Sequence, residues 1–182
     1  AGGGVIGALG THAFDTLAWL IGPVGSVQAL NSVSIPERPG SDGAMRSVDA
    51  EDVALIQTTL SWQGRSDCAV PAQLNLASVT RQGRGCWLEV YGSKGTLILG
   101  SENQKDYVHG FSLWYASCGE PLRSIQADAD LAFSTTWSDG RVAPVARIQG
   151  WWAESMRSGQ PMVPGLMEGV ASRLACDAAA SK

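Results

Sequence analysis

The sequence has few charged residues and no long apolar run, and both absences narrow the classes of protein to which it can belong. Charged residues make up 16% of its 182 residues, and the net charge is −4. Without a basic stripe, nucleic acid is not the expected partner. No apolar stretch approaches the ~20 residues that cross a bilayer, and the first residues lack the basic region and cleavage site of a signal peptide. What remains is a globular chain, and its 45% hydrophobic residues support that conclusion.

Cysteine and histidine are also scarce, which argues against a metal site or a disulfide framework. The four cysteines are widely spaced, with no C-x-x-C pair and no histidine at zinc-ligand spacing. Such a pattern is typical of reduced, partly buried thiols in a cytoplasmic protein. The cysteines are Cys68, Cys86, Cys118 and Cys176.

The order of the predicted elements indicates the fold class. Apolar residues at helical spacing predict a helix over residues 8–21, which Gly22 and Pro23 end, and residues 36–49 are predicted as a loop. A helix, then antiparallel-looking strands, then helices predict an α+β fold with helices on one face of a sheet. The predicted strands are 24–35, 53–62, 68–80, 87–91, 96–99 and 107–116, a hairpin turn covers 92–95, 118–140 is irregular, and the last helices are 145–157 and 167–180.

The length of the chain suits one domain and is too short for two, so residues 1–182 are predicted to form a single domain. The uncovered face of the sheet needs a second copy or another domain to cover it. We therefore expect a homo-oligomer through the sheet face.

The glycine run at the start, Gly2-Gly3-Gly4-Val5-Ile6-Gly7, fits the G-x-G-x-x-G pattern of dinucleotide-binding loops as a string of letters. In such a loop the glycines follow a strand and open a helix whose N-terminus meets the pyrophosphate. Only Ala1 precedes the run, so we predict a flexible or tight approach to the helix and no cofactor-binding residue in this chain.

The predicted first helix carries the best candidate for chemistry. Ala8, His12, Asp15 and Trp19 recur at spacings that place them along one face, while the apolar residues around Phe14 occupy another face. Histidine titrates near neutral pH and suits proton transfer with a substrate hydroxyl, and a nearby carboxylate can orient it or bind substrate. The other histidine, His109, is predicted to be structural.

Several segments together resemble the C-terminal domain of the Gfo/Idh/MocA oxidoreductase family. Residues 2–15 are similar to its G-G-G-x-x-x-D-x-G-x-H-x-x-D segment, and Trp19-Leu20-Ile21-Gly22 matches the end of the same helix. Residues 88–97 (L-E-V-Y-G-S-K-G-T-L) resemble its strand-turn-strand element. Residues 51–54 resemble the start of its next long strand, and residues 168–169 and 177–181 resemble its last helix, so the likeness covers nearly the whole chain.

The resemblance implies a large, open, mostly antiparallel sheet that binds substrate and forms the oligomer interface. It also implies an N-terminal Rossmann domain, absent from this chain, that binds NAD or NADP and supplies a lysine from a Glu-Lys-Pro segment. His12 matches the family's acid/base residue. Asp15 matches its second acidic position, where contact with substrate and bracing of the helix both stay open, and Trp19 lies on the substrate side.

One departure from the family pattern leaves two hypotheses. The family's acidic residue four positions before the histidine is Ala8 here, and a methyl group neither accepts a hydrogen bond nor balances a positive charge. The first hypothesis is the substrate-binding and oligomerisation domain of an NAD(P)-dependent dehydrogenase or reductase for a sugar, polyol or related hydroxyl compound, inactive as an isolated fragment. The alternative is a non-catalytic dimerisation or ligand-binding module of the same fold.

Overall fold

The computed structural model describes residues 3–65, 67–101, 111–126, 133, 135 and 137–181. The chain forms two compact units. One consists of Ala1–Arg81 and Val163–Lys182, and the other of Gln82–Met162. Whether these units behave as the single domain expected from chain length stays a prediction.

The first unit is built on a three-stranded antiparallel sheet with the order β1-β4-β5. Its strands are β1 (Val24–Ser32), β4 (Val53–Ser61) and β5 (Ala69–Ala77). Burial alternates along β4, as a strand with only one covered face requires. Pro71 is tolerated because β5 is an edge strand of this sheet.

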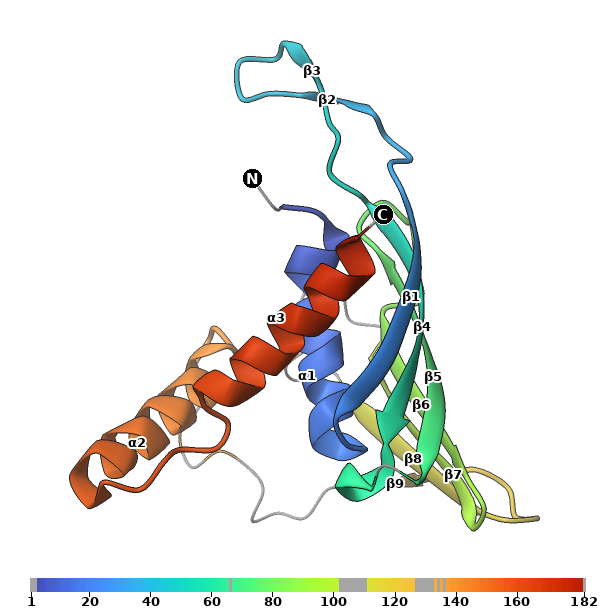
Figure 1. Cartoon of the computed structure of the whole chain (residues 1–182), viewed down its shortest axis with the longest axis vertical. Coiled ribbons are helices and arrows are strands. Elements are labelled where there is room, and N and C mark those ends of the chain that lie inside the picture. The colour runs from blue at the N-terminus through green and yellow to red at the C-terminus, as the bar shows by residue number, and fades with distance from the viewer. Residues whose placement is uncertain are drawn as a thin grey trace. The chain divides into compact units, whose positions relative to one another are not determined.

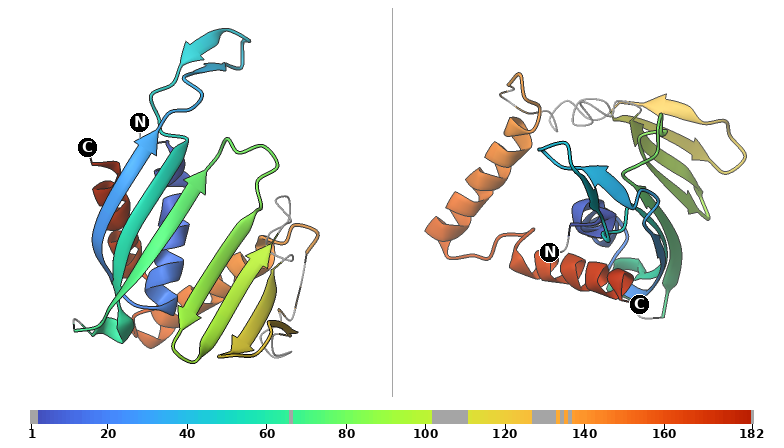
Figure 2. Two further views of the ribbon diagram at one scale, coloured as in Figure 1. Left: turned by 90° about the vertical axis from the view of Figure 1, so that its right-hand side faces the viewer. Right: turned by 90° about the horizontal axis from the view of Figure 1, so that it is seen from above.

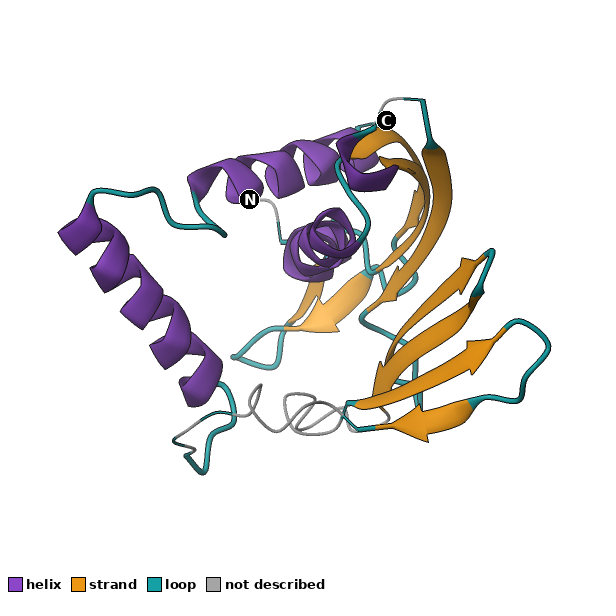
Figure 3. Cartoon of the chain, turned by 90° about the horizontal axis from the view of Figure 1, so that it is seen from below, coloured by secondary structure: helices purple, strands orange, loops and turns teal. Residues whose placement is uncertain are grey.

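Two helices of this unit lie on the same side of the strands (Figures 1 and 3). A π-helical turn, η1 (Ile6–Gly10), leads directly into α1 (Thr11–Leu20), and α3 (Leu166–Ala180) packs against α1, η1 and β1. The core between the layers contains Phe14 and Ile56, both 0% exposed. Helices on one face of an antiparallel sheet confirm the predicted α+β fold class.

The second unit contains a four-stranded antiparallel sheet with the order β6-β7-β8-β9. Its strands are β6 (Cys86–Gly92), β7 (Gly95–Ser101), β8 (Ser112–Ser117) and β9 (Arg123–Ile125). The unit also includes α2 (Val142–Ser158). The guanidinium and backbone amide of Arg141 bind Asp139 just before α2 and lower the pKa of that carboxyl to about 2.

Most predicted elements are present with shifted ends. The first predicted helix is the combination of η1 and α1, and the predicted strands correspond to β1, β4, β5, β6 and β7. The predicted strand 107–116 corresponds in part to β8, but residues 107–110, and with them His109, lie outside the described residues. No helix in the described ranges is both long and apolar enough to cross a membrane.

The predicted loop 36–49 is wrong in part, because it contains a hairpin. Strands β2 (Glu37–Pro39) and β3 (Met45–Ser47) pair and project from the ends of β1 and β4 (Figures 1 and 2). The Asp42 carboxylate accepts hydrogen bonds from the Ala44 amide and, at 2.8 Å, from Arg46. These local bonds give the turn a defined shape without a hydrophobic core beneath it.

The buried face of α3 does not contain its large apolar residues. Val170 and Leu174 are 49% and 64% exposed, whereas smaller residues face α1 and β1. Small side chains allow close approach, and a Cβ on Gly10 would lie 3.3 Å from the Cys176 sulfur. The buried residues of α3 are Ser172, Ala175, Cys176 and Ala179.

Candidate functional site

Helix α1 separates a buried face from an exposed one. Phe14 and Leu17 are 0% and 9% exposed and face the interior of the first unit. His12 and Trp19 lie on the opposite side, where Trp19 is 81% exposed. The separation follows from the 3.6-residue period, which turns residues 12 and 19 to one side and residues 14 and 17 to the other.

The structure brings the three predicted site residues onto one face of α1. Asp15 is half-buried and follows His12 by about one turn, and Trp19 follows Asp15 by another turn. Within the described part of the chain, neither the imidazole nor the Asp15 carboxylate has a hydrogen-bond or ion-pair partner.

Ala8 differs from the other members of the predicted face because it lies inside the π-helical turn. A π-helical turn contains an extra residue, so the four-residue spacing of an α-helix does not carry over from Ala8 to His12. Ala8 is nevertheless exposed, as His12 is. The uninterrupted face thus consists of His12, Asp15 and Trp19.

The glycine run is in contact with Glu51, which precedes β4. The Glu51 carbonyl oxygen accepts a hydrogen bond from the Val5 amide at 2.8 Å, and its Oε1 accepts one from the Ile6 amide at 3.1 Å. The carbonyl and carboxylate oxygens of Glu51 thus already occupy two amides that a pyrophosphate would need, and the carboxylate charge would repel a pyrophosphate. The described residues of this run therefore do not fit a dinucleotide, and the absence of a cofactor-binding residue from this chain stays a prediction.

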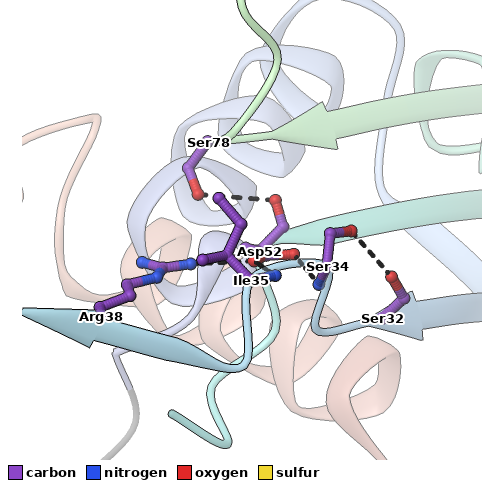
Figure 4. A network of polar contacts seen from close by, with 6 residues as sticks. All are labelled: Ser32, Ser34, Ile35, Arg38, Asp52 and Ser78. Carbon is purple, nitrogen blue, oxygen red and sulfur yellow. Dashed lines mark hydrogen bonds and ion pairs between the residues drawn. The ribbon is translucent and has the colours of Figure 1, made fainter. Parts of the chain in front are cut away.

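Asp52, the neighbour of Glu51, binds the chain segments that meet at the start of β4 (Figure 4). Its carboxylate is 1% exposed and accepts hydrogen bonds from the amides of Ser34 and Ile35, at 2.7 and 2.9 Å, and from Arg38 Nη2 at 2.9 Å. The amide of Ser34 contributes most to lowering the pKa of Asp52, and burial opposes it. The Asp52 carbonyl oxygen accepts a hydrogen bond from the Ser78 amide at 3.0 Å, so one residue connects three strand ends.

Sequence reasoning recognised residues 51–54 as a strand start but missed what Glu51 and Asp52 bind. Their partners are remote in the chain, 45 residues away for the bond from Ile6 to Glu51. The available signal was two adjacent acids immediately before an apolar strand, because an acid buried there would need hydrogen-bond donors. Nothing in that pattern identifies the donors.

The family model "Oxidoreductase family, C-terminal alpha/beta domain" matches residues 1–182. The chain therefore belongs to the Gfo/Idh/MocA oxidoreductase family, as its C-terminal domain.

Individual relatives give the same result. The chain is 45% identical over 178 residues to an uncharacterized oxidoreductase of Synechocystis sp., a match that covers 97% of this chain and 46% of that protein. It is 26% identical over 127 residues to levoglucosan dehydrogenase of Pseudarthrobacter phenanthrenivorans, covering 62% of this chain and 31% of the relative. A solved structure of levoglucosan dehydrogenase in complex with NADH and L-sorbose has the same fold, with a TM-score of 0.74, 19% identity and coverage of 98% of this chain and 48% of that one. The chain thus spans about half the length of the relatives it matches.

Proposed function

We propose that this chain is the substrate-binding and oligomerisation half of an NAD(P)-dependent oxidoreductase that acts on a hydroxyl group of a sugar or polyol. The observation that carries the proposal is the imidazole of His12 on α1, which is exposed and has no hydrogen-bond partner among the described residues, in a chain of this family. The sequence similarity to a levoglucosan dehydrogenase supports a sugar as the substrate.

His12 is assigned the proton transfer. When a hydroxyl-bearing carbon is oxidised, the hydroxyl proton must leave, and an imidazole nitrogen within hydrogen-bond distance can accept it. In the reverse direction the same nitrogen returns the proton to the carbonyl oxygen. Asp15 can accept a hydrogen bond from a neighbouring substrate hydroxyl, and the exposed Trp19 indole offers an apolar plane to the C–H face of a sugar ring.

The nicotinamide cofactor is assigned to the part of the protein outside this chain. In the glycine run, Glu51 already occupies the Val5 and Ile6 amides that a pyrophosphate would need. We therefore assign no step that involves the cofactor to any residue of this chain. An N-terminal Rossmann domain, as in the rest of the family, would supply that site.

Replacing His12 in the full-length protein tests the assignment. We expect His12→Ala to lower kcat by about 10²- to 10⁴-fold, because general acid–base catalysis contributes about that much. The affinity for NAD, measured by fluorescence titration, should stay the same. Turnover is followed by reduced-nicotinamide absorbance with levoglucosan and a panel of sugars and polyols.

His109→Ala provides the matched control, since it removes the same side chain elsewhere in the sequence and should leave kcat close to that of the unchanged protein. Equal turnover in His12→Ala and the unchanged protein would remove His12 from the mechanism. A full-length protein with no turnover on any compound of the panel would favour the non-catalytic module of the same fold.

We also propose that the outer face of the β1-β4-β5 sheet, the side away from α1 and α3, is the contact between copies of the protein. Gln28, Gln57 and Gln73 form a row across the three strands and contribute to a groove of about 450 Å³. No residue on this face is charged among those the structure describes, and charge is depleted in the centre of protein interfaces. Its members are Ser26, Gln28, Leu30, Ser32, Val53, Leu55, Gln57, Thr59, Ser61, Ala69, Pro71, Gln73, Asn75 and Ala77.

A further inference from the structure

Glu51 makes an unusual contact with the start of the helical segment that carries His12. It binds two successive amides by different groups, the Val5 amide through its main-chain carbonyl and the Ile6 amide through its carboxylate. Both Val5 and Ile6 are 2% exposed, so water does not replace these bonds. Losing either acceptor would leave a buried donor without a partner.

Gly4 is the residue that makes this contact sterically feasible. A Cβ at position 4 would lie 2.0 Å from the Cδ and Oε1 of Glu51, far inside van der Waals contact. Any larger residue would push the carboxylate away from the Ile6 amide. The third glycine of the run therefore serves the Glu51 contact, a purpose that the nucleotide-loop pattern does not suggest.

The peptide groups of Ile6 are held from two sides. Its amide binds Glu51 Oε1, and its carbonyl oxygen accepts a hydrogen bond from the Cys176 thiol at 3.6 Å. Burial raises the pKa of the Cys176 thiol, which keeps it in the protonated form that donates this bond. These anchors lie at the first residue of the π-helical turn Ile6–Gly10.

The π-helical turn determines which side of α1 faces outward relative to this anchor. One extra residue in a turn rotates all that follows by about 100° compared with an unbroken α-helix. With the anchor in place, Phe14 and Leu17 point into the core and His12 points outward. A relaxed turn would change the rotation of the first residues of α1, where His12 is the second residue.

We infer that Glu51 is a positioning residue for His12: its carboxylate, seated against Gly4, holds the π-helical turn that aims the imidazole at the substrate side. The inference rests on the role proposed for His12. It adds a residue 39 positions away that does not itself touch substrate.

The test compares Glu51→Ala with Glu51→Gln in the full-length protein. Mass spectrometry measures the carbethoxylation of His12 by diethylpyrocarbonate across pH, and hydrogen exchange of residues 5–10. Glu51→Ala should raise the exchange rate about tenfold or more, because a hydrogen bond to a charged group contributes at least that factor. It should also change the rate or the pH midpoint of His12 modification. Glu51→Gln, which retains an acceptor oxygen of the same reach, should restore both readouts.

Two further variants complete the design. Asp49→Asn removes an exposed acid two residues away and should change neither readout. Glu51→Asp keeps the charge but shortens the side chain by one methylene. It should show the same two changes that we expect of Glu51→Ala, and it takes the place of that variant if Glu51→Ala does not fold.

An unchanged rate and pH midpoint of His12 modification in Glu51→Ala or Glu51→Asp would overturn the inference, whatever happens to exchange, since Glu51 would then only cap the helix. A Glu51→Gln protein that behaves like Glu51→Ala would overturn it as well, because charge rather than geometry would be the cause. None of these readouts requires turnover, so they stay separate from the His12→Ala result.

Discussion

Two adjacent acidic residues, Glu51 and Asp52, bind different parts of the first unit at the start of β4. Glu51 points to the helical layer and binds the Ile6 amide, whereas Asp52 binds the chain that leaves β1. Successive side chains before a strand point to different sides, so a pair of acids can reach two separate sets of donors. One short segment thereby connects the sheet to the helix that carries His12.

Asp52 should make the stability of the protein dependent on acid. Its pKa in the folded state is below the ordinary 3.8, so its contribution is complete above about pH 4 and is lost as the pH falls through the lowered value. Asp52→Asn should lower Tm by several degrees at neutral pH, because an amide cannot accept all three bonds, and the gap should narrow below pH 3.8. Thermal unfolding across pH measures this gap.

Asp42→Asn is the control for this prediction. Asp42 is 54% exposed in its ion pair with Arg46, and such surface pairs contribute only ~0–1 kcal/mol. A gap between Asp52→Asn and the unchanged protein that stays constant down to strongly acid pH would contradict the role given to Asp52.

At the level of single residues, the sequence predicted which side chains of a helix are exposed, because that follows from the helical period. It did not predict contacts between residues that are far apart in the chain. The period of α1 alone separates His12 from Phe14, and the structure exposes the first and buries the second. The catalytic part assigned to His12 stays a prediction, as do the substrate contacts of Asp15 and Trp19. The role of Glu51 could not be predicted, since the contact of its carboxylate with the Ile6 amide depends on Gly4, a glycine 47 positions earlier.

At the scale of elements, the β6-β7-β8 sheet depends on a glycine opposite a tryptophan. Trp87 pairs with Gly100 and reaches across it to stack on Trp114, with ring centroids 5.7 Å apart. A Cβ at position 100 would lie 2.2 Å from the Trp87 ring. The Arg84 guanidinium lies 3.8 Å from the centre of the same ring. The indole thus has little freedom to move away.

Gly100→Ala should therefore destabilise the protein by about 1–3 kcal/mol, the usual cost of overpacking. Chemical unfolding gives the free energy, and tryptophan fluorescence reports the loss of the stack. Gly92→Ala in the same sheet is the control, because its Cβ would make only an ordinary 3.5 Å contact with Gly95. Equal stability of the two variants would show that Trp87 adapts without cost.

Strand and helix positions were largely predictable, while the burial of whole faces was not. Alternation along β4 indicated its strand, and the buried Ile56 and exposed Gln57 bear it out. On α3, Val170 and Leu174 lie on one face, and that face is exposed in this structure. Hydrophobicity favours large side chains, but the close packing around Cys176 selects small ones. The hairpin within 36–49 was missed because its turn is fixed by Asp42 and not by apolar alternation.

At the scale of the whole molecule, the uncharged outer face of the first sheet leads to a prediction about assembly. Gln57 occupies the middle of the glutamine row, so a charge there would lie in the middle of the proposed contact. Gln57→Glu should weaken association of the full-length protein, since juxtaposed like charges cost several kcal/mol. Light scattering over a range of concentrations should show a smaller mass than for the unchanged protein.

The same substitution at Gln149, an exposed position on α2, is the control and should leave the mass unchanged. If the unchanged protein is a monomer at all concentrations, the proposed contact between copies is wrong. If Gln57→Glu retains the full mass, the contact lies on another surface.

Hydrogen bonds hold the base of the β2–β3 hairpin, where it joins β1 and β4. Arg38 and the amides of Ser34 and Ile35 bind Asp52, and the Val48 amide binds the Pro36 carbonyl at 2.8 Å. Because these hydrogen bonds hold the base of the hairpin, a change in length beyond them should not shift β1 or β4. Evolution can therefore lengthen or shorten the exposed tip at 40–44 without disturbing the rest of the unit, and an experimenter can insert a reporter peptide at the same point.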